Sequence, residues 1–163
     1  MNYYRITKYN PDNRNLDGSY KNQLEWTEFM GYFKTDPTIS EYLLVESAYI
    51  SYLLELLIFN DNKNYQLQAC EKNNLSAPNS KIKTDFNFLE TQLRNYFRHI
   101  GNMWSLITTQ NFCIYVSSDM YIYILSKGKK IETGVRKFEN IGLYIEEFDN
   151  FIFQDDWDIQ FLE

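Results

Sequence analysis

The chain has 163 residues, of which 44% are hydrophobic and 23% charged, with 16 Lys and Arg against 22 Asp and Glu and a formal net charge of −6. This composition excludes a disordered or fibrous protein, and the length suits one domain whose core needs no disulfide or metal. Polar residues interrupt the longest apolar runs, and the first residues lack a signal-peptide pattern. We therefore expect a cytoplasmic protein with no membrane span.

The first part of the chain predicts one strand followed by irregular segments. Residues 3–9 (YYRITKY) alternate in the period of two that is typical of a half-buried strand. Residues 11–22 are rich in Asn, Asp, Gly and Ser and predict a loop. Residues 24–33 regain apolar character, and we expect a short strand or turn that packs against the core.

The middle of the chain predicts a long helix and a strand. Residues 42–59 are all compatible with a helix, Thr38 or Ser40 can cap its N-terminus, and Glu41 lies near the positive end of its dipole. Leucines and isoleucines occupy most of its circumference, so we expect the helix to be buried on most sides. Residues 65–71 then alternate as a strand.

The second half predicts another helix and a series of strands. Residues 72–84 are expected to form an exposed connector, and residues 85–100 a helix capped by Thr84 or Asp85. Four strands follow at residues 104–107, 112–116, 121–125 and 142–148, with turns at 117–119 and 127–129. This order predicts a single α+β domain over residues 1–163, with a mainly antiparallel sheet and two principal helices packed on one face of it.

Residues that could support catalysis are few. The only histidine, His99, lies near the end of the second predicted helix, where a cation complements the helix dipole. Cys70 and Cys113 lie far apart in apolar stretches, and we expect both to be reduced core residues. Arg94 and Arg98 share a helix face, which we interpret as solvated rather than as a phosphate clamp. No phosphate-loop, dinucleotide-binding or hydrolase motif occurs, so we expect no enzyme, no metal and no cofactor.

Negative charge is concentrated toward the C-terminal end. Residues 139–163 contain eight acidic residues and no Lys or Arg, a local charge of −8, which leaves +2 of the total of −6 for residues 1–138. Phe and Trp side chains lie between these acids. Such a segment would repel nucleic acid phosphates and suits a basic protein partner, because aromatic rings supply buried area and carboxylates supply steering. The alternative is a solvated acidic segment whose aromatic residues alternate into the sheet.

The residues expected to contact a partner all belong to this segment: Glu146, Glu147, Asp149, Asp155, Asp156, Trp157 and Asp158. Glu146 and Glu147 are adjacent in a predicted strand, so one of them must break the alternation, and we expect a bulge or a strand end there. Paired carboxylates can also bind a divalent metal in a hydrolase, but that use requires them to converge in a cleft.

Three motifs resemble a group of small bacterial proteins. Residues 1–11 (MNYYRITKYNP) give a similar tyrosine-rich first strand, residues 41–46 (EYLLVE) match an E-Y-L-x-V-E stretch that enters a helix, and residues 142–148 (GLYIEEF) resemble a G-L-Y/F-V-E-E-F signature near the C-terminus. That group resembles the immunity proteins of polymorphic or contact-dependent toxin systems. The shared positions are mainly fold-forming aromatic residues, so the resemblance assigns no functional residues.

The resemblance implies that the protein binds the C-terminal domain of a cognate toxin and neutralises it by stoichiometric occlusion. Many such domains are nucleases with basic surfaces, which agrees with the acidic segment at residues 139–163. Two alternatives from other classes stay open. One is a small metal-dependent hydrolase that uses the C-terminal carboxylates, and the other is a non-enzymatic scaffold that forms a homodimer or larger oligomer.

Overall fold

The structure, a computed structural model, describes residues 1–15, 21, 39–59, 64–71, 74–75, 85–98, 100, 104–117, 121–131, 134–138 and 141–148. The strands in these ranges are β1 (Asn2–Thr7), β2 (Gln66–Glu71), β3 (Asn74–Leu75), β4 (Trp104–Thr108), β5 (Phe112–Val116), β6 (Tyr121–Ser126), β7 (Gly134–Phe138) and β8 (Ile141–Phe148). The helices are α1 (Ile39–Phe59) and α2 (Phe86–Phe97), and a 3₁₀ turn follows β1 at Pro11–Asn13.

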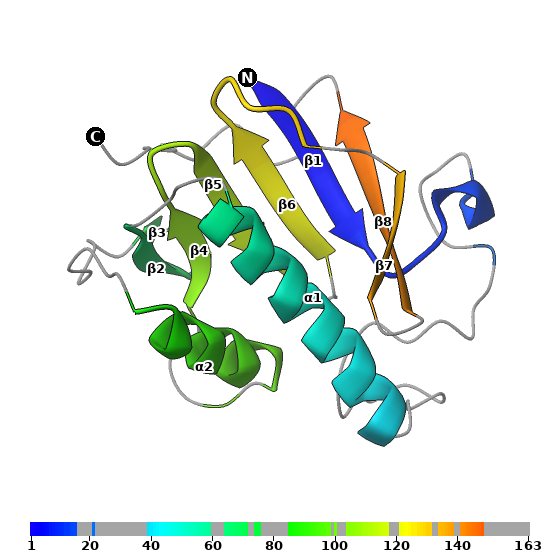
Figure 1. Ribbon diagram of the computed structural model, residues 1–163, viewed down its shortest axis with the longest axis horizontal. Coiled ribbons are helices and arrows are strands. Elements are labelled where there is room, and N and C mark those ends of the chain that lie inside the picture. The colour runs from blue at the N-terminus through cyan, green and yellow to red at the C-terminus, as the bar shows by residue number, and fades with distance from the viewer. Residues whose placement is uncertain are drawn as a thin grey trace.

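The described strands form one antiparallel sheet in the order β3-β2-β4-β5-β6-β1-β8-β7. β1 is inserted between β6 and β8, so that Arg5 lies opposite Tyr123 on one side and opposite Glu146 on the other. Both helices lie on the same side of the sheet (Figure 1). The expected α+β domain, with two helices packed on a mainly antiparallel sheet, is therefore confirmed.

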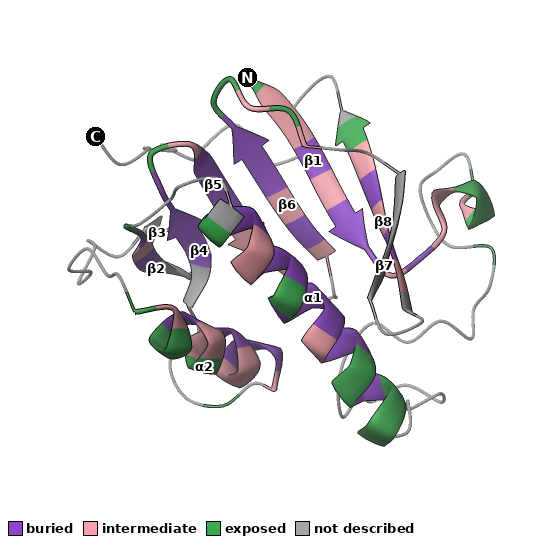
Figure 2. Ribbon diagram, viewed as in Figure 1, coloured by how far each residue is buried: buried purple, intermediate pink, exposed green. Residues whose placement is uncertain are grey.

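The main core fills the space between the helices and the sheet. Alternate strand residues face it, such as Tyr4 and Ile6 of β1 and Ile122 and Ile124 of β6. The helices contribute a matching set of buried side chains, namely Tyr42, Tyr49, Leu53, Leu57, Leu89, Leu93 and Phe97. The intervening strand residues face the other way, where Leu106, Cys113 and Leu125 form a smaller buried cluster. Figure 2 shows this burial along the centre of the sheet.

Helix α1 packs one face inward and exposes the other. Tyr49 and Tyr52 of the inner face are almost completely buried, whereas Leu43, Leu44 and Ile58 are 39%, 43% and 50% exposed. Buried side chains extend over more than half of the circumference of the helix, so the expectation that it is buried on most sides is confirmed, apart from this exposed strip. The sheet and α2 both lie on its inner side, so neither of them covers the outward-facing leucines.

Helix α2 begins at the expected cap. The Asp85 carboxylate accepts hydrogen bonds from the backbone N–H groups of Asn87 and Phe88, at 3.0 and 3.2 Å, which satisfies two donors that have no partner within the helix. The helix ends at Phe97, earlier than the expected end at residue 100, and Arg98 occupies the C-cap position with its N–H bonded to carbonyls of the last turn.

The strands predicted at residues 3–9, 65–71, 104–107, 112–116, 121–125 and 142–148 are confirmed as β1, β2, β4, β5, β6 and β8. Strand β3, inside the expected connector, and strand β7 were not predicted. The turn at 127–129 is present, and Gly128 adopts a φ of 75°, a left-handed conformation that glycine tolerates best. The segment 24–33, most of the connector 72–84 and most of the turn 117–119 lie outside the described residues.

Candidate functional site

Two of the residues expected to contact a partner lie in the described part of the chain. Glu146 and Glu147 are on β8, and the others, Asp149, Asp155, Asp156, Trp157 and Asp158, lie outside the described residues. The pairing of β8 with β1 keeps one register through Phe148, so the expected strand end is confirmed and the pairing contains no bulge here. The two glutamates therefore face opposite sides of the sheet, with Glu147 on the side of the helices.

Glu146 is held by two arginines on the face opposite the helices. Arg5 donates from Nε to Oε2 at 2.8 Å and from Nη2 to Oε1 at 3.1 Å, and Arg14 donates from Nη2 to Oε2 at 3.1 Å. The side chains of Glu146, Arg5 and Arg14 are only 18%, 14% and 9% exposed. A bidentate pair in such a poorly solvated place is stronger than a surface ion pair.

The ring of Tyr121 contacts both arginines of this ion pair. The guanidinium carbons of Arg5 and Arg14 lie 5.4 and 5.8 Å from the ring centre of Tyr121, within the range of a cation–π interaction. The ring centre of Tyr123 lies 6.0 Å from that of Tyr121 on the same strand, β6. It lies 6.3 Å from the ring centre of Tyr115 on the neighbouring strand, β5. The cluster of charged and aromatic side chains thus extends over β5, β6, β1 and β8 and ties Glu146 into the sheet.

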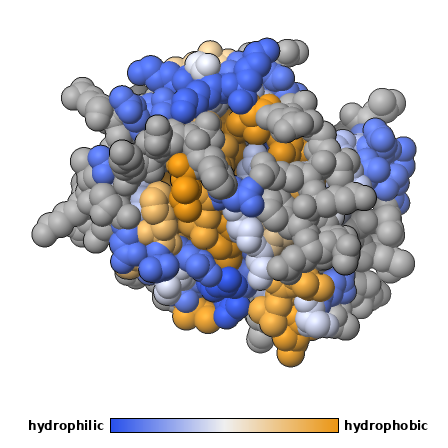
Figure 3. Space-filling view, in the orientation of Figure 1, coloured by the Kyte–Doolittle hydropathy of each residue, from blue (hydrophilic) through white to orange (hydrophobic). Residues whose placement is uncertain are grey.

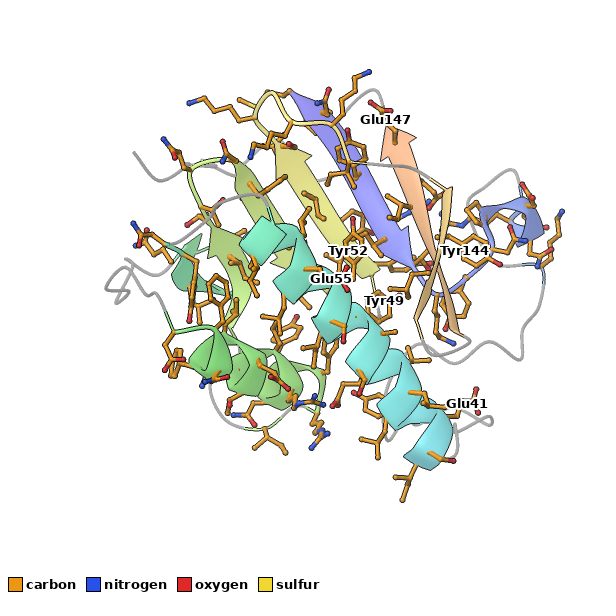
Figure 4. The ribbon with its side chains drawn as sticks, viewed as in Figure 1. Glu41, Tyr49, Tyr52, Glu55, Tyr144 and Glu147 are labelled. Atoms are coloured by element: carbon orange, nitrogen blue, oxygen red, sulfur yellow. The ribbon has the colours of Figure 1, made fainter. Side chains whose placement is uncertain are left out.

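Glu147, by contrast, is exposed. It lies opposite Tyr4 near the end of β8, where Figure 4 shows its carboxylate at the rim of the sheet. Because two arginines offset the charge of Glu146, Glu147 is the one of the two glutamates that presents a negative charge at the surface. The sequence prediction treated the two glutamates as equivalent, and the structure separates them.

A second charged cluster joins the two helices and was not predicted. The side chain of Glu46 on α1 is fully buried, and its carboxylate accepts hydrogen bonds from Arg94 Nη1 at 2.8 Å, from Arg98 Nε at 2.8 Å and from Arg98 Nη2 at 2.6 Å. Arg94 also binds Glu90 one turn earlier. The interpretation of Arg94 and Arg98 as a solvated helix face is wrong, because both guanidinium groups turn toward this buried carboxylate.

Tyr42 completes this contact between the helices. Its hydroxyl donates to the backbone carbonyl of Phe97 at 2.8 Å, at the C-terminal end of α2. Burial raises the pKa of Tyr42 above its ordinary value, and the nearby charge of Glu46 raises it further. The hydrogen bond with Glu46 likewise raises the pKa of Arg98. The hydrogen bonds of Tyr42 and Glu46 hold the two helices together, which is a structural role.

The residues that could bind a metal or react as nucleophiles give no assembled site in the described ranges. No three His, Cys, Asp or Glu side chains lie close enough there to hold a metal ion. Cys113 on β5 is a buried, reduced thiol, in agreement with the expected core role, whereas His99 and the side chain of Cys70 lie outside the described residues. Within the described residues, neither helix combines the length and apolarity that a membrane crossing requires.

Comparison of the chain with protein-family models, with curated proteins and with solved structures finds no match in any of the three.

Proposed function

We propose that this chain is an immunity-type protein that binds a bacterial toxin domain and neutralises it by stoichiometric occlusion. One observation carries the proposal. Residues 139–163 hold eight acidic residues and no basic one, and the exposed Glu147 stands at the rim of the sheet within this segment. The motifs at residues 41–46 and 142–148, which resemble immunity proteins, support the same function.

The mechanism is binding without a chemical step. A toxin domain that acts on nucleic acid needs a basic surface for its substrate, and an acidic protein that covers this surface competes directly with the phosphates. Complementary charge accelerates the encounter, and aromatic side chains among the acids provide the buried area that slows dissociation. Neutralisation then requires one copy of this chain for each toxin domain, in the cytoplasm, where the toxin meets its substrate.

The framework of the sheet supports this role for Glu147. β8 pairs with β7 over residues 141–145 and with β1 over residues 144–148, so its backbone is held by a neighbouring strand along its length, and Glu147 is held by β1. The ion pair of Glu146 with Arg5 lies one residue earlier and holds the end of β8 against β1. A fixed backbone avoids the cost of ordering the main chain on binding, so that only the Glu147 side chain has to be ordered.

The test is co-expression with the product of the gene immediately upstream, followed by affinity purification and native mass spectrometry. We expect a one-to-one complex, together with loss of the toxin's activity and restored growth of the co-expressing cells. A toxin that remains active in the presence of excess protein, with no complex at micromolar concentration, would refute the proposal. Protection of growth without a stable complex would also count against occlusion.

A further inference from the structure

The face of the sheet that points away from the helices is covered over part of its area. Leu106, Cys113 and Leu125, which we call the covered cluster, lie on this face and are only 3%, 2% and 5% exposed. The described hydrophobic residues that pack against them, Tyr3 and Tyr115, belong to the same sheet. Neighbours in one layer shield a side chain from the sides, whereas its outer end is shielded only by chain that lies on the layer. Both helices lie on the other side of the sheet (Figure 1), so a segment outside the two helices covers the cluster.

The end of β8 lies in line with the covered cluster. Phe148, the last residue of β8, is opposite Tyr3, and Tyr3 is opposite Leu125. Leu125 in turn is opposite Cys113, so the four residues form one row across β8, β1, β6 and β5. The chain leaves β8 at one end of this row, and residues 149–163 follow.

The spacing of the next aromatic residues fits the length of the row. Neighbouring strands lie about 4.8 Å apart, so Leu125 is about 10 Å and Cys113 about 14 Å from β8. An extended chain advances about 3.3 Å per residue, which carries Phe151 about 10 Å and Phe153 about 17 Å beyond Phe148. Residues two apart in an extended chain point to the same side. An extended course across the sheet therefore turns both rings toward the covered cluster.

The charge at this edge of the sheet favours the same course. The turn that follows β6 carries Lys127, Lys129 and Lys130, of which the first and the last are exposed. β6 and β8 end at the same edge of the sheet (Figure 1), and Figure 3 shows hydrophilic surface along that edge. Residues 149–163 contain five acidic residues and no Lys or Arg. An acidic segment that starts beside a basic turn is attracted toward it.

Residues 22–38 are another long segment outside the described residues, but they start and end away from this row. Lys21, just before them, is bound to the 3₁₀ turn: its backbone N–H donates to the Asn13 carbonyl and its Nζ to the Asp12 carbonyl. That turn follows the end of β1, whereas the row crosses the start of β1. Ile39, just after them, begins α1 on the other side of the sheet.

We propose that residues 149–153 cross the face of the sheet opposite the helices and place Phe151 and Phe153 on the covered cluster. The two rings bury the outer ends of the cluster's side chains, and this apolar contact holds the segment in place. Residues 155–158 then extend from a fixed point on the domain and remain available to a partner. The inference goes beyond the proposed function and does not depend on it.

Cys113 reports directly on its cover. In a Cys70→Ser background it is the only cysteine of the chain, and its reaction with a maleimide is followed by mass spectrometry under native conditions. We expect Phe151→Ala/Phe153→Ala to raise the reaction rate at least tenfold, because the rings no longer shield the thiol. The matched control Phe161→Ala removes a ring beyond the docked residues and should change the rate less than twofold. Circular dichroism and urea unfolding establish that each variant keeps its fold.

A cross-link tests the position of Phe153 even if the double alanine variant unfolds. In the same background, a short bifunctional thiol reagent joins Cys113 to the cysteine of Phe153→Cys, and mass spectrometry of the digested protein identifies the link. We expect intramolecular cross-linking at least tenfold faster than in Phe161→Cys, which carries the same new thiol beyond the docked residues.

Several outcomes would overturn the proposal. One is unchanged reactivity of Cys113 in a folded Phe151→Ala/Phe153→Ala variant, and another is equal cross-linking in the two cysteine variants. If Phe29→Ala/Phe33→Ala exposes Cys113 instead, residues 22–38 cover the cluster. If Cys113 is protected only at concentrations at which light scattering shows a dimer, a second copy covers it. No toxin enters these measurements, so their result leaves the proposed function to its own test.

Discussion

Arg5 and Glu146 lie directly opposite each other on β1 and β8, and two hydrogen bonds of 2.8 and 3.1 Å join their side chains. Arg14, beyond the end of β1, binds the same carboxylate at 3.1 Å. One glutamate thus fixes both the pairing of two strands and the segment that follows the first of them. This relationship decides which acidic residue of β8 belongs to the framework and which is available to a partner.

The first prediction separates these two roles by stability. Glu146→Ala removes the carboxylate that Arg5 and Arg14 share in a poorly solvated place, and we expect it to lower the free energy of unfolding by about 2 to 4 kcal/mol. Glu147→Ala changes an exposed side chain, and we expect a change within about 0.5 kcal/mol. Urea denaturation of the two variants measures both values. Equal losses would show that Glu147 is also structural.

The second prediction concerns association with the proposed toxin partner. Glu147→Lys reverses a charge at the rim of the sheet, so we expect a several-fold slower association rate at low salt, a smaller effect at high salt and a nearly unchanged melting temperature. Stopped-flow or surface-plasmon measurements give the rates. The control is Asp12→Lys, which makes the same charge change on the exposed 3₁₀ turn. Equal slowing by the control would mean that net charge alone, rather than Glu147, guides the encounter.

The third prediction tests the buried carboxylate between the helices. Glu46→Ala leaves Arg94 and Arg98 without their shared acceptor, and we expect a loss of about 3 kcal/mol in the free energy of unfolding. Glu90→Ala removes the other partner of Arg94, but that side chain is 38% exposed and pairs within one helix, so about 0.5 kcal/mol is expected. Thermal and urea unfolding compare the two variants. A small effect of Glu46→Ala would contradict the assigned role.

The fourth prediction concerns alkaline pH. Burial, reinforced by the charge of Asp85, raises the pKa of Tyr65 from 10.0 to about 12. The folded state therefore holds this proton more tightly than the unfolded state, so its contribution to stability is complete below pH 10 and is lost as the pH rises toward 12. Tyr65→Phe also removes the hydrogen bond from the Tyr65 hydroxyl to the Asp85 carbonyl, at a cost of about 1 kcal/mol at pH 9.

The measurement is urea denaturation of wild type and Tyr65→Phe at pH 9 and pH 11.5. We expect the variant to lose less stability than wild type between these two pH values, because it has no Tyr65 proton to release. Parallel losses in both proteins would assign the alkaline sensitivity to other groups.

Much of the fold was predictable because its elements follow strong local patterns. The mostly apolar run that forms α1, the alternation in β1 and the short runs of aromatic and β-branched residues that form β5 and β6 are visible in short windows of sequence. β3 was missed because it has only two residues, and β7 because Arg136 and Lys137 interrupt any alternation. β3 and β7 form by pairing with β2 and β8, and a short window of sequence does not reveal that pairing.

The charged clusters were less predictable than the elements that carry them. Alternation places Glu146 and Glu147 on opposite faces, but the partner that distinguishes them, Arg5, is 141 residues away. Glu46 lies among buried apolar residues of α1, and Arg94 and Arg98 lie four residues apart on another helix. The sequence therefore shows a carboxylate on one helix and two cations on another. Only the packing of α1 on α2 shows that Arg94 and Arg98 pair with Glu46.

The central position of β1 has a consequence for the growing chain. Its Tyr3 pairs with Leu125 and Phe148, so both neighbours of this strand are synthesised long after it. At roughly 5–20 residues per second, translation continues for on the order of ten seconds before either neighbour exists. During that interval β1 has two open edges, a state in which strands from different nascent chains can pair wrongly. A charge in the middle of a strand opposes such pairing. Arg5 therefore opposes wrong pairing of β1 until Glu146 has been synthesised.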